Sequence, residues 1–392
     1  MNQTEFNRRV FLKSMAGVAA MAGAGLVPGN VQAAADRREL KLWCPGIAKP
    51  WKTWEPMEKA SGVKIKWTVK SADAQELLQK MLVGGGQKLY DAFTDNGGGM
   101  EDAMAETGNI VPLDTSRMPN WFLLNDSVRK SDGVAAHTIR YKGVVHAVPY
   151  ISNADSMAYL PEELGFKPDS WAYLFDRQFK GRVAMQNDFG PTLTNTAIYL
   201  KQAGLQGIED PSNMTPKEVK GVCQFLIDHK KAGQFRTFWS GFGDSVNLLV
   251  QKEVVMMSCW EPQVYVARRR GVYVEYGTMR EGHQVWNNVV MLSTGGKARG
   301  KEEAFYRVCN VFLSHWYTSQ QLAKLGFGSL TDGVMDYIIG HPETFNKDMV
   351  THLKAVLANK AKRYANPGNA WQNVYPKHLE AYQEWWSRVQ AA

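Results

Sequence analysis

Short apolar runs alternate with amphipathic segments along most of the chain. Apolar or alternating runs predict strands over 40–43, 63–69, 90–93, 182–185 and 254–259. Apolar residues at helical spacing predict helices over 51–60, 72–82, 191–203, 216–230, 351–361 and 377–389. The order strand, helix, strand, helix is typical of a parallel sheet with helices on both faces, and it starts again near Gly181. The pattern therefore predicts an α/β protein with two lobes.

The first 33 residues form a segment of a different kind. Arg8 and Arg9 precede Phe-Leu-Lys, an apolar stretch rich in Ala, Gly, Met and Val covers 14–27, and Val31–Ala33 resembles a cleavage site. A positive start, a short apolar centre and a small-residue end are typical of a signal peptide. The paired arginines resemble the twin-arginine export signal, so we expect export to the periplasm by the twin-arginine translocase. The alternative is a cytoplasmic amphipathic arm. Residues 1–33 are excluded from the fold.

Length and charge narrow the class further. The roughly 360 residues after this segment exceed one typical hydrophobic core, which agrees with two lobes. The formal net charge is +8, and the first 33 residues carry +2 of it, which leaves about +6. Lys and Arg are scattered, except for short runs at 268–270 and 360–363 that we expect on solvated faces. Nucleic-acid binding needs a concentrated basic surface and is not expected.

The cysteines give no sign of a metal site. Cys44, Cys223, Cys259 and Cys309 lie far apart, and no C-x-x-C spacing occurs. Their apolar neighbours favour buried free thiols, although a periplasmic location would permit a disulfide.

Polar and aromatic residues follow several of the predicted strands. These loops contain Trp43, Asn96, Asp188 and Trp260. Ligand sites in open α/β sheets form beyond the carboxyl ends of the strands. An aromatic wall with a few placed polar groups suits a small solute, and Trp faces attract ammonium groups. The alternative is that the two Trp residues belong to the core, and that Asp188 and Asp95 are turn or helix-capping residues.

Catalytic motifs are absent from the sequence. H-E-x-x-H and G-x-S-x-G do not occur, and the glycine-rich stretch at 295–302 lacks the closing Ser/Thr of a P-loop. We therefore expect no enzyme activity, no cofactor and no metal. An exported enzyme stays open as an alternative class, because twin-arginine export often serves cofactor-loaded redox proteins.

Several short sequence motifs occur along the chain in a recognisable order. They are Tyr90–Phe93, Asn109–Asp114, His146–Tyr150, Trp171–Phe175, Val264–Arg268, Glu281–Asn288 and Asn369–Asn373. From about Glu39 to Trp386 the chain thereby resembles the spermidine/putrescine-binding proteins of ABC importers, a branch of the extracellular solute-binding family.

The resemblance implies a type II-like periplasmic binding protein made of two lobes. Lobe 1 would comprise 37–152 and 287–331, and lobe 2 would comprise 153–286 and 332–392. Crossing segments are implied near 150–159, 285–288 and 329–334. The ligand would bind in the cleft between lobes that hinge shut around it. The partners would be a small solute and the membrane permease of the ABC transporter, and we expect a monomer.

The resemblance also assigns ligand contacts, residue by residue. The implied ligand-binding residues are Trp43, Asn96, Asp188, Trp260, Trp286, Asn288, Phe327 and Gln372. Asp188 matches an acidic residue that holds a ligand amine.

The chain departs from the family pattern at three positions. The Trp-x-Asp of the family reads Trp286-Asn287-Asn288 here, Pro191 stands at a second acidic position, and Gly98 replaces an aromatic residue. A buried diamine requires compensating charges, since an unpaired ammonium is costly to desolvate. We therefore expect a solute with one cationic centre, or a zwitterion.

The loop before the predicted helix at 191–203 offers another interpretation. Pro191 at the first helical position, after Gly190, would leave backbone N–H groups free to bind a carboxylate or phosphonate, with Thr192, Thr194 and Asn195 near enough to assist. An anionic solute is therefore the first alternative. A plain capped helix start would carry no ligand.

Overall fold

A computed structural model describes most of the chain. The described residues are 38–69, 77, 79–95, 100–328, 330–372, 374 and 376–392. The predicted signal peptide, Asn96 and most of the helix predicted over 72–82 lie outside them.

The first lobe is built on a six-stranded sheet. Its strands are β1 (Glu39–Cys44), β2 (Lys64–Val69), β3 (Ala92–Asp95), β6 (Val148–Ala154), β12 (Gln284–Leu292) and β13 (Ala370–Trp371). The order is β13-β12-β3-β1-β2, and β6 also pairs with β12. β1 runs parallel to β2 and β3, whereas β12 runs antiparallel to β3 and β6.

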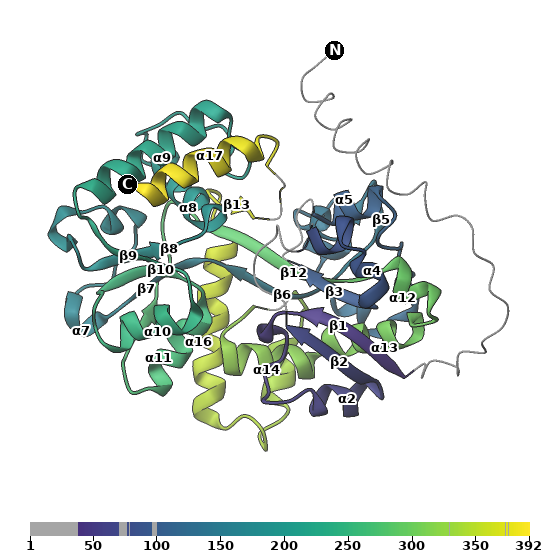
Figure 1. Ribbon diagram of the computed structural model, residues 1–392. Helices are drawn as coiled ribbons and strands as arrows, with labels where there is room; N and C mark the ends of the chain where they lie inside the picture. The colour runs from purple at the N-terminus through teal and green to yellow at the C-terminus, as the bar shows by residue number, and fades with distance from the viewer. Residues whose placement is uncertain are drawn as a thin grey trace, which may run out of the picture.

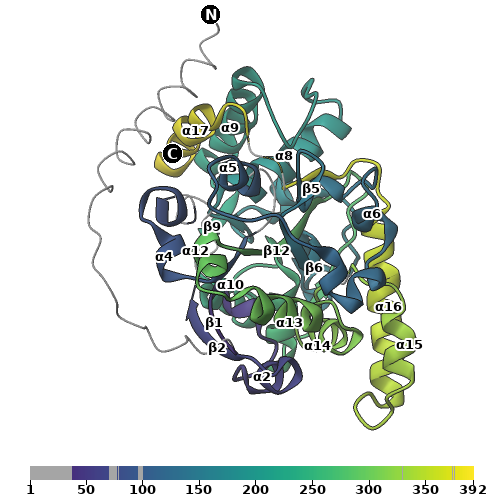
Figure 2. The ribbon, with the colours of Figure 1, turned by 90° about the vertical axis from the view of Figure 1, so that its right-hand side faces the viewer.

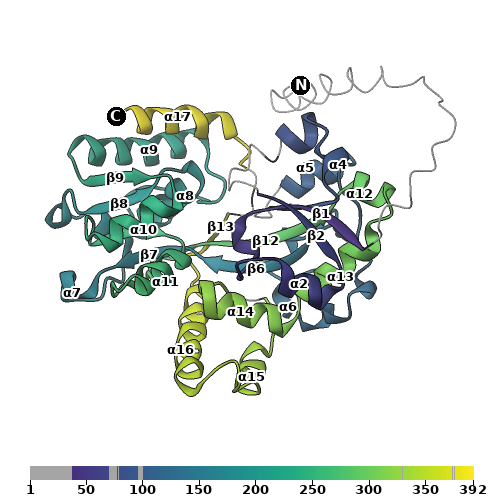
Figure 3. The ribbon, with the colours of Figure 1, turned by 60° about the horizontal axis from the view of Figure 1, so that its bottom comes forward.

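Helices cover both faces of this sheet. They are α2 (Glu55–Ser61), α4 (Gly86–Leu89), α5 (Met100–Glu106), α12 (Thr294–Ala298), α13 (Glu302–Phe312) and α14 (His315–Leu325). α4, α5 and α12 lie on one side, and α2 and α13 lie on the other (Figures 1 and 3). Leu42, Phe93 and Phe305 are fully buried between these layers, so apolar burial stabilises the lobe.

The second lobe has a five-stranded sheet of its own. In the order β11-β7-β10-β8-β9 its strands are Glu275–Tyr276, Ser156–Tyr159, Met256–Cys259, Val183–Gln186 and Phe235–Trp239. Its helices are α7 (Pro161–Leu164), α8 (Phe189–Gln202), α9 (Pro216–Lys231), α10 (Phe242–Val250), α11 (Glu261–Arg269) and α17 (Leu379–Ala391). α8, α9 and α17 lie on one face, and α10 and α11 lie on the other (Figure 3).

The remaining elements are shorter or lie beside the lobes. They are α6 (Asp126–Arg129), β4 (Arg140–Tyr141), β5 (Val144–Val145), α15 (Val334–Ile339) and α16 (Lys347–Tyr364). Single turns of 3-10 helix cover Gly46–Ala48, Thr115–Arg117, Pro119–Leu123, Ala136–Thr138, Trp171–Leu174 and Arg177–Phe179, and a π-helical turn covers Gln79–Val83. α15 and α16 pack on α14 around Leu322, Ile338 and Leu353, and Figure 2 shows this group at one side of the molecule.

The two sheets meet at β6, β7 and β12. β6 belongs to the first sheet and β7 to the second, and only Asp155 separates them. The Asp155 N–H donates to the Gln284 carbonyl of β12 at 2.7 Å. The chain therefore passes between the sheets at Asp155, within the crossing segment implied near 150–159. The exact lobe bounds stay a prediction.

The sequence pattern located most of the elements it predicted. The helix predicted over 51–60 begins only at Glu55, with Pro56 in its first turn, where proline is tolerated. The helix predicted over 191–203 begins two residues earlier, at Phe189. β12 carried no periodic signal because all nine of its residues are buried.

Two further findings bear on the sequence expectations. None of the four cysteines forms a disulfide, and all four are buried. None of the helices in the described part of the chain combines the length and the hydrophobicity that a membrane span requires.

Candidate functional site

Three of the predicted ligand residues lie together where the sheets meet. Trp286 and Asn288 are two apart on β12 and therefore project to the same face. Phe327 precedes Gly328, which bridges to Ser152 of β6, and its ring meets the Trp286 ring edge-on with centroids 5.6 Å apart. All three side chains are buried. This face carries the aromatic and amide groups expected of the site.

A buried carboxylate adjoins this face. Asp155 accepts a hydrogen bond from the Trp286 indole, Nε1 to Oδ1, at 2.8 Å. Asn153, paired with Trp286 across β6 and β12, lies 3.5 Å from the same carboxylate oxygen. Burial raises the pKa of Asp155 to about 7, although the bonds from Trp286 and Asn153 and the charges of Lys360 and Arg363 act in the opposite direction.

Beyond Asn153 lies a buried ion cluster. The Lys360 ammonium donates to Asn153 Oδ1 at 2.8 Å and to Glu261 Oε2 at 2.5 Å, and Arg363 Nη2 reaches the same Glu261 oxygen at 3.0 Å. Burial lowers the pKa of Lys360 to about 8, opposed by the Glu261 carboxylate. The expectation that the basic run 360–363 lies on a solvated face is therefore wrong for Lys360 and Arg363, which are 3% and 1% exposed. They face Glu261 because residues three apart share one side of a helix.

Asn288 has an aromatic hydroxyl near it. The Tyr150 O–H points at Asn288 Oδ1 from 3.5 Å, and burial raises the pKa of Tyr150 well above its usual value. The neighbouring Asn287 projects the other way and donates from Nδ2 to Thr138 Oγ1 at 3.0 Å. Asn288, not Asn287, is thus available to the face that carries Trp286.

Trp43 is a core residue in this structure. It is fully buried in the first lobe and stacks on Tyr90 with ring centroids 5.2 Å apart, while the Lys80 ammonium lies 4.8 Å from its ring. The alternative considered for Trp43, an ordinary core aromatic, describes these contacts well.

Trp260 differs from Trp43 in being only partly buried. It caps the start of α11, directly before Glu261 of the ion cluster, and its ring meets Trp239 edge-on at 5.3 Å. Its position at the end of β10 is the strand-end position predicted for a ligand residue.

Asp188 is the N-cap of α8. Its carboxylate accepts from the Gly190 N–H at 2.9 Å. Since the helix begins at Phe189, Pro191 is not the first helical residue, and that expectation is corrected. Thr192 donates to the Gln186 carbonyl at 2.6 Å, so its hydroxyl is engaged in the local fold. The capped helix start is the arrangement observed.

Of the last two predicted ligand residues, one can be placed in the structure and the other cannot. Gln372 is half-buried, and its backbone N–H donates to the Val285 carbonyl at 2.9 Å, which places it beside Trp286. Asn96 lies outside the described residues. The structure therefore gathers Trp286, Asn288, Phe327 and Gln372, whereas Trp43 and Asp188 have structural contacts of their own.

Sequence reasoning missed Asp155 and the cluster behind it. A signal was present, because Asp155 is the only charged residue in the stretch 147–160. A lone carboxylate in an otherwise neutral, buried run requires a buried partner.

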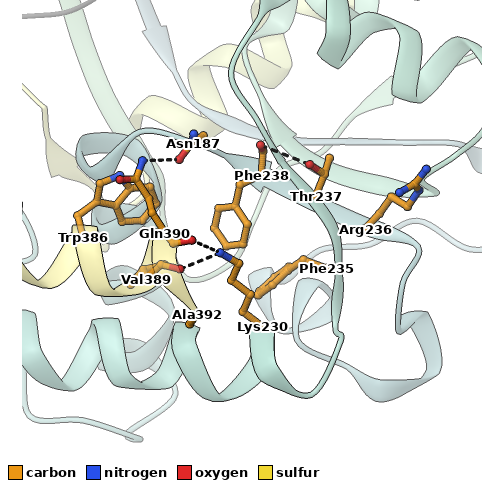
Figure 4. Close-up of a pocket in the computed structure, with 10 residues that line it drawn as sticks. All are labelled: Asn187, Lys230, Phe235, Arg236, Thr237, Phe238, Trp386, Val389, Gln390 and Ala392. Atoms are coloured by element: carbon orange, nitrogen blue, oxygen red, sulfur yellow. Dashed lines mark hydrogen bonds between the residues drawn. The ribbon is translucent and has the colours of Figure 1, made fainter.

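Two surface cavities lined by described residues lie away from this face. One of about 500 Å³ lies on the second lobe between α9, β9 and the end of α17, where Lys230 donates to the carbonyls of Val389 and Gln390 at 2.9 and 2.8 Å (Figure 4). Another, of about 400 Å³, lies between α4 and α12 on the first lobe. Neither is lined by a predicted ligand residue. The described residues also contain no group of three or more His, Cys, Asp or Glu able to hold a metal ion.

Comparison with known proteins identifies the family to which the chain belongs. A family model described as a bacterial extracellular solute-binding protein matches residues 47–331. Among solved structures, a spermidine/putrescine ABC transporter protein of Listeria monocytogenes has a TM-score of 0.67 at 14% identity, covering 90% of this chain and 99% of its own. The Tp0655 (TpPotD) lipoprotein of Treponema pallidum gives 0.67 at 15% identity, with 90% and 99% covered. The Atu4243 GABA receptor gives 0.63 at 16% identity, with 90% and 97% covered. These likenesses establish a shared two-sheet fold.

Proposed function

The chain belongs to the bacterial extracellular solute-binding protein family, and on this basis we propose that it is the receptor of an ABC importer for a small amine-containing solute. The family is one of binding proteins, so the exported-enzyme alternative is set aside. The solute would bind between the lobes and be delivered to the membrane permease. The structurally similar proteins are named for different solutes, spermidine/putrescine in one case and GABA in another, so the fold does not select the ligand.

One observation carries the amine assignment. Trp286 and Phe327 form an edge-to-face pair beside the amide of Asn288, on the face of the strands that join the two sheets. Aromatic faces attract ammonium groups, and an amide oxygen accepts a hydrogen bond from them. Ligand contact at this junction would involve both lobes at once.

The charges near this face favour one cationic centre over two. Position 288 is an amide and position 191 is Pro, so Asp188 is the one acidic residue among the predicted ligand residues. A diamine would leave one desolvated ammonium without a carboxylate, which is costly. A monoamine or an amino acid-like zwitterion therefore fits better than a polyamine.

The anionic alternative is less well supported. It depended on free N–H groups at the start of α8, and the Asp188 carboxylate is bound there. A second anion at that helix start would meet like-charge repulsion. The anionic solute stays as the outcome that the titration below can reveal.

The test is a calorimetric titration of putrescine, spermidine, 4-aminobutyrate, glutamate and phosphate. We expect 4-aminobutyrate or another amine to bind wild type, and Trp286→Ala to weaken that binding by about 1–2 kcal/mol or more, since a buried aromatic supplies contact area and cation–π attraction.

The matched control is Trp386→Ala. Trp386 is 6% exposed, close to the 4% of Trp286, but lies in the core of the second lobe. It should lower stability without lowering affinity. Binding of phosphate alone would replace the amine receptor with an anion receptor, and unchanged binding by Trp286→Ala would remove Trp286 from the site.

We also propose export through the paired arginines at the start of the sequence. Changing Arg8 and Arg9 together to Lys should leave uncleaved precursor in the cytoplasm, because the translocase receptor reads the two guanidinium groups. Cell fractionation and immunoblotting measure this. Normal periplasmic maturation of the double variant would contradict twin-arginine export.

A further inference from the structure

A chain of buried polar contacts crosses the junction between the lobes. It begins at the Trp286 indole, which donates to Asp155, and passes by way of Asn153 to Lys360. Lys360 then binds Glu261, at the start of α11. Strand β12, the β6–β7 crossing, α16 and α11 are thereby connected.

The chain reaches two of the predicted aromatic ligand residues. Trp286 is bound directly through its indole N–H, and Trp260 is the residue immediately before Glu261. The two aromatic residues come from different sheets. The network fixes the Trp286 indole directly and, through Glu261, the start of the helix that Trp260 caps.

The charges of this cluster balance only when Asp155 is ionised. Lys360 and Arg363 are two cations, and Glu261 is a single carboxylate bound to both. With Asp155 ionised, two positive charges face two negative ones. Burial opposes that ionisation and raises the pKa of Asp155 to about 7, so the balanced state forms only as the pH rises through neutrality.

The backbone groups of Asp155 are engaged separately from its side chain. Its backbone N–H already completes the strand pairing by binding the Gln284 carbonyl, and its own carbonyl oxygen lies 2.9 Å from His283 Nδ1. The side chain, by contrast, contacts the one aromatic residue that lies at the centre of the proposed site. A side chain at the point where the sheets join is also where movement of one lobe against the other is smallest.

We propose that Asp155 is a positioning residue of the solute site, which holds the Trp286 ring in its binding orientation through the indole N–H and ties that ring to the charge cluster at the lobe junction. This inference rests on the proposed function, in which the Trp286 face contacts the solute.

The ionisation of Asp155 makes the positioning testable by pH. Groups around it come from each neighbouring element: Asn153, Cys259, Glu261, Tyr276, His283, Trp286, Lys360, Arg363 and Tyr364. Burial raises the pKa of Asp155 to about 7, so its charge changes within the accessible pH range, whereas the pKa of His283 is lowered to about 3 by burial. Lys360, with a pKa lowered to about 8, must be distinguished from Asp155 by substitution.

The first experiment needs no ligand. The indole groups are labelled with nitrogen-15, and the Trp286 resonance is identified by its loss in Trp286→Phe. Between pH 5.5 and 8.5 we expect that resonance to shift with a midpoint near 7 in wild type, to shift with a higher midpoint in Lys360→Gln because the Lys360 charge lowers the pKa of Asp155, and to stay constant in Asp155→Asn. A resonance that titrates equally in Asp155→Asn would overturn the proposal.

The second experiment separates positioning from charge balance. At pH 8.5, Asp155→Asn should weaken binding of 4-aminobutyrate by about tenfold, because a neutral amide oxygen is a weaker acceptor for the Trp286 indole than a carboxylate. Asp155→Asn combined with Lys360→Gln removes one charge of each sign, and the affinity should stay low in this double variant. Recovery of the affinity would show that Asp155 only neutralises Lys360, and the proposal would fail.

The two experiments keep the inference distinct from the proposed function. If no amine binds wild type, the proposed function fails, and the indole titration still decides whether Asp155 controls Trp286. If amines bind and the titration is absent from wild type, the function stands and the inference is wrong.

Discussion

Lys360 and Lys362 stand two positions apart on α16, yet the first is buried in an ion cluster and the second is exposed. The difference follows from helical geometry, which turns Lys360 and Arg363 toward Glu261 and Lys362 toward solvent. At the scale of single residues, a lysine is therefore buried in an ion cluster or exposed to solvent according to the face of the helix on which it lies. The run 360–363 could be recognised in the sequence, but not which of its charges are buried.

His283 allows a test of burial at this scale. It is fully buried, and burial, together with the charge of Arg363, lowers its pKa to about 3. An unfolded histidine has a pKa of about 6.5. The folded state therefore favours the neutral ring, and this contribution to stability is complete above pH 6.5 and is lost as the pH falls toward 3.

We predict that His283→Gln makes stability less sensitive to acid. Between pH 7.5 and 4.5, the free energy of unfolding measured in urea should fall by about 2–3 kcal/mol less than in wild type. Asp155, whose pKa is raised to about 7, contributes stability that is full below about pH 4 and is lost up to pH 7, but it does so equally in both proteins. The exposed His378, changed to Gln, is the control and should follow wild type. Parallel curves for wild type and His283→Gln would contradict the prediction.

At the scale of elements, the start of α8 shows how one carboxylate can serve a helix or a ligand. Asp188 caps the helix through the Gly190 N–H, and the dipole of a 14-residue helix favours a negative charge there. The sequence predicted both a ligand residue and, as the alternative, a cap. In the structure, the Asp188 carboxylate makes the contact of a helix cap.

Two substitutions at position 188 distinguish these roles. Asp188→Ala removes the cap and should cost about 1 kcal/mol of stability, whereas Asp188→Asn keeps it and should cost little. If the carboxylate also contacts a solute amine, Asp188→Asn should lower affinity for the amine found by titration by about tenfold. Chemical denaturation and calorimetry measure the two effects.

Asp176 supplies the matched control for this prediction. It accepts the Gln178 N–H at 3.0 Å in the same local geometry, also in the second lobe. Asp176→Asn should leave affinity unchanged. Equal affinities for Asp188→Asn and wild type would make Asp188 a helix cap and remove it from the site.

At the scale of the whole molecule, two sheets with separate cores are joined through β6–β7 and β12. Because few segments cross between the lobes, rotation of one lobe against the other disturbs little of either core. A solute that contacts both lobes would bind the closed arrangement more tightly and so increase its population.

We therefore predict that the protein becomes more compact on binding its solute. Small-angle scattering should give a smaller radius of gyration at saturating ligand, and the melting temperature should rise with ligand concentration above the dissociation constant. Trp286→Ala at the same ligand concentration is the control and should respond less. A radius that stays constant while calorimetry shows saturation would contradict hinged closure.

The site was only partly accessible from the sequence. Trp286, Asn288, Phe327 and Gln372 were assigned through the resemblance, and the structure brings them together at the lobe junction. Asp155 was not predicted as a site residue, because its role depends on a hydrogen bond from Trp286, which is 131 positions away in the chain. Local pattern contains no information about such long-range pairs.

By itself, the sequence determined the fold class and the family resemblance, because alternating apolar periodicity and ordered phrases are local properties that survive in any context. It also determined which residues follow the strands. Only the tertiary structure decided which charges are buried, that Trp43 packs in a core, and that Asp188 caps a helix. The physical reason is that burial and pairing depend on elements far apart in the chain, and a carboxylate or an ammonium acquires its role from the partners that folding brings to it.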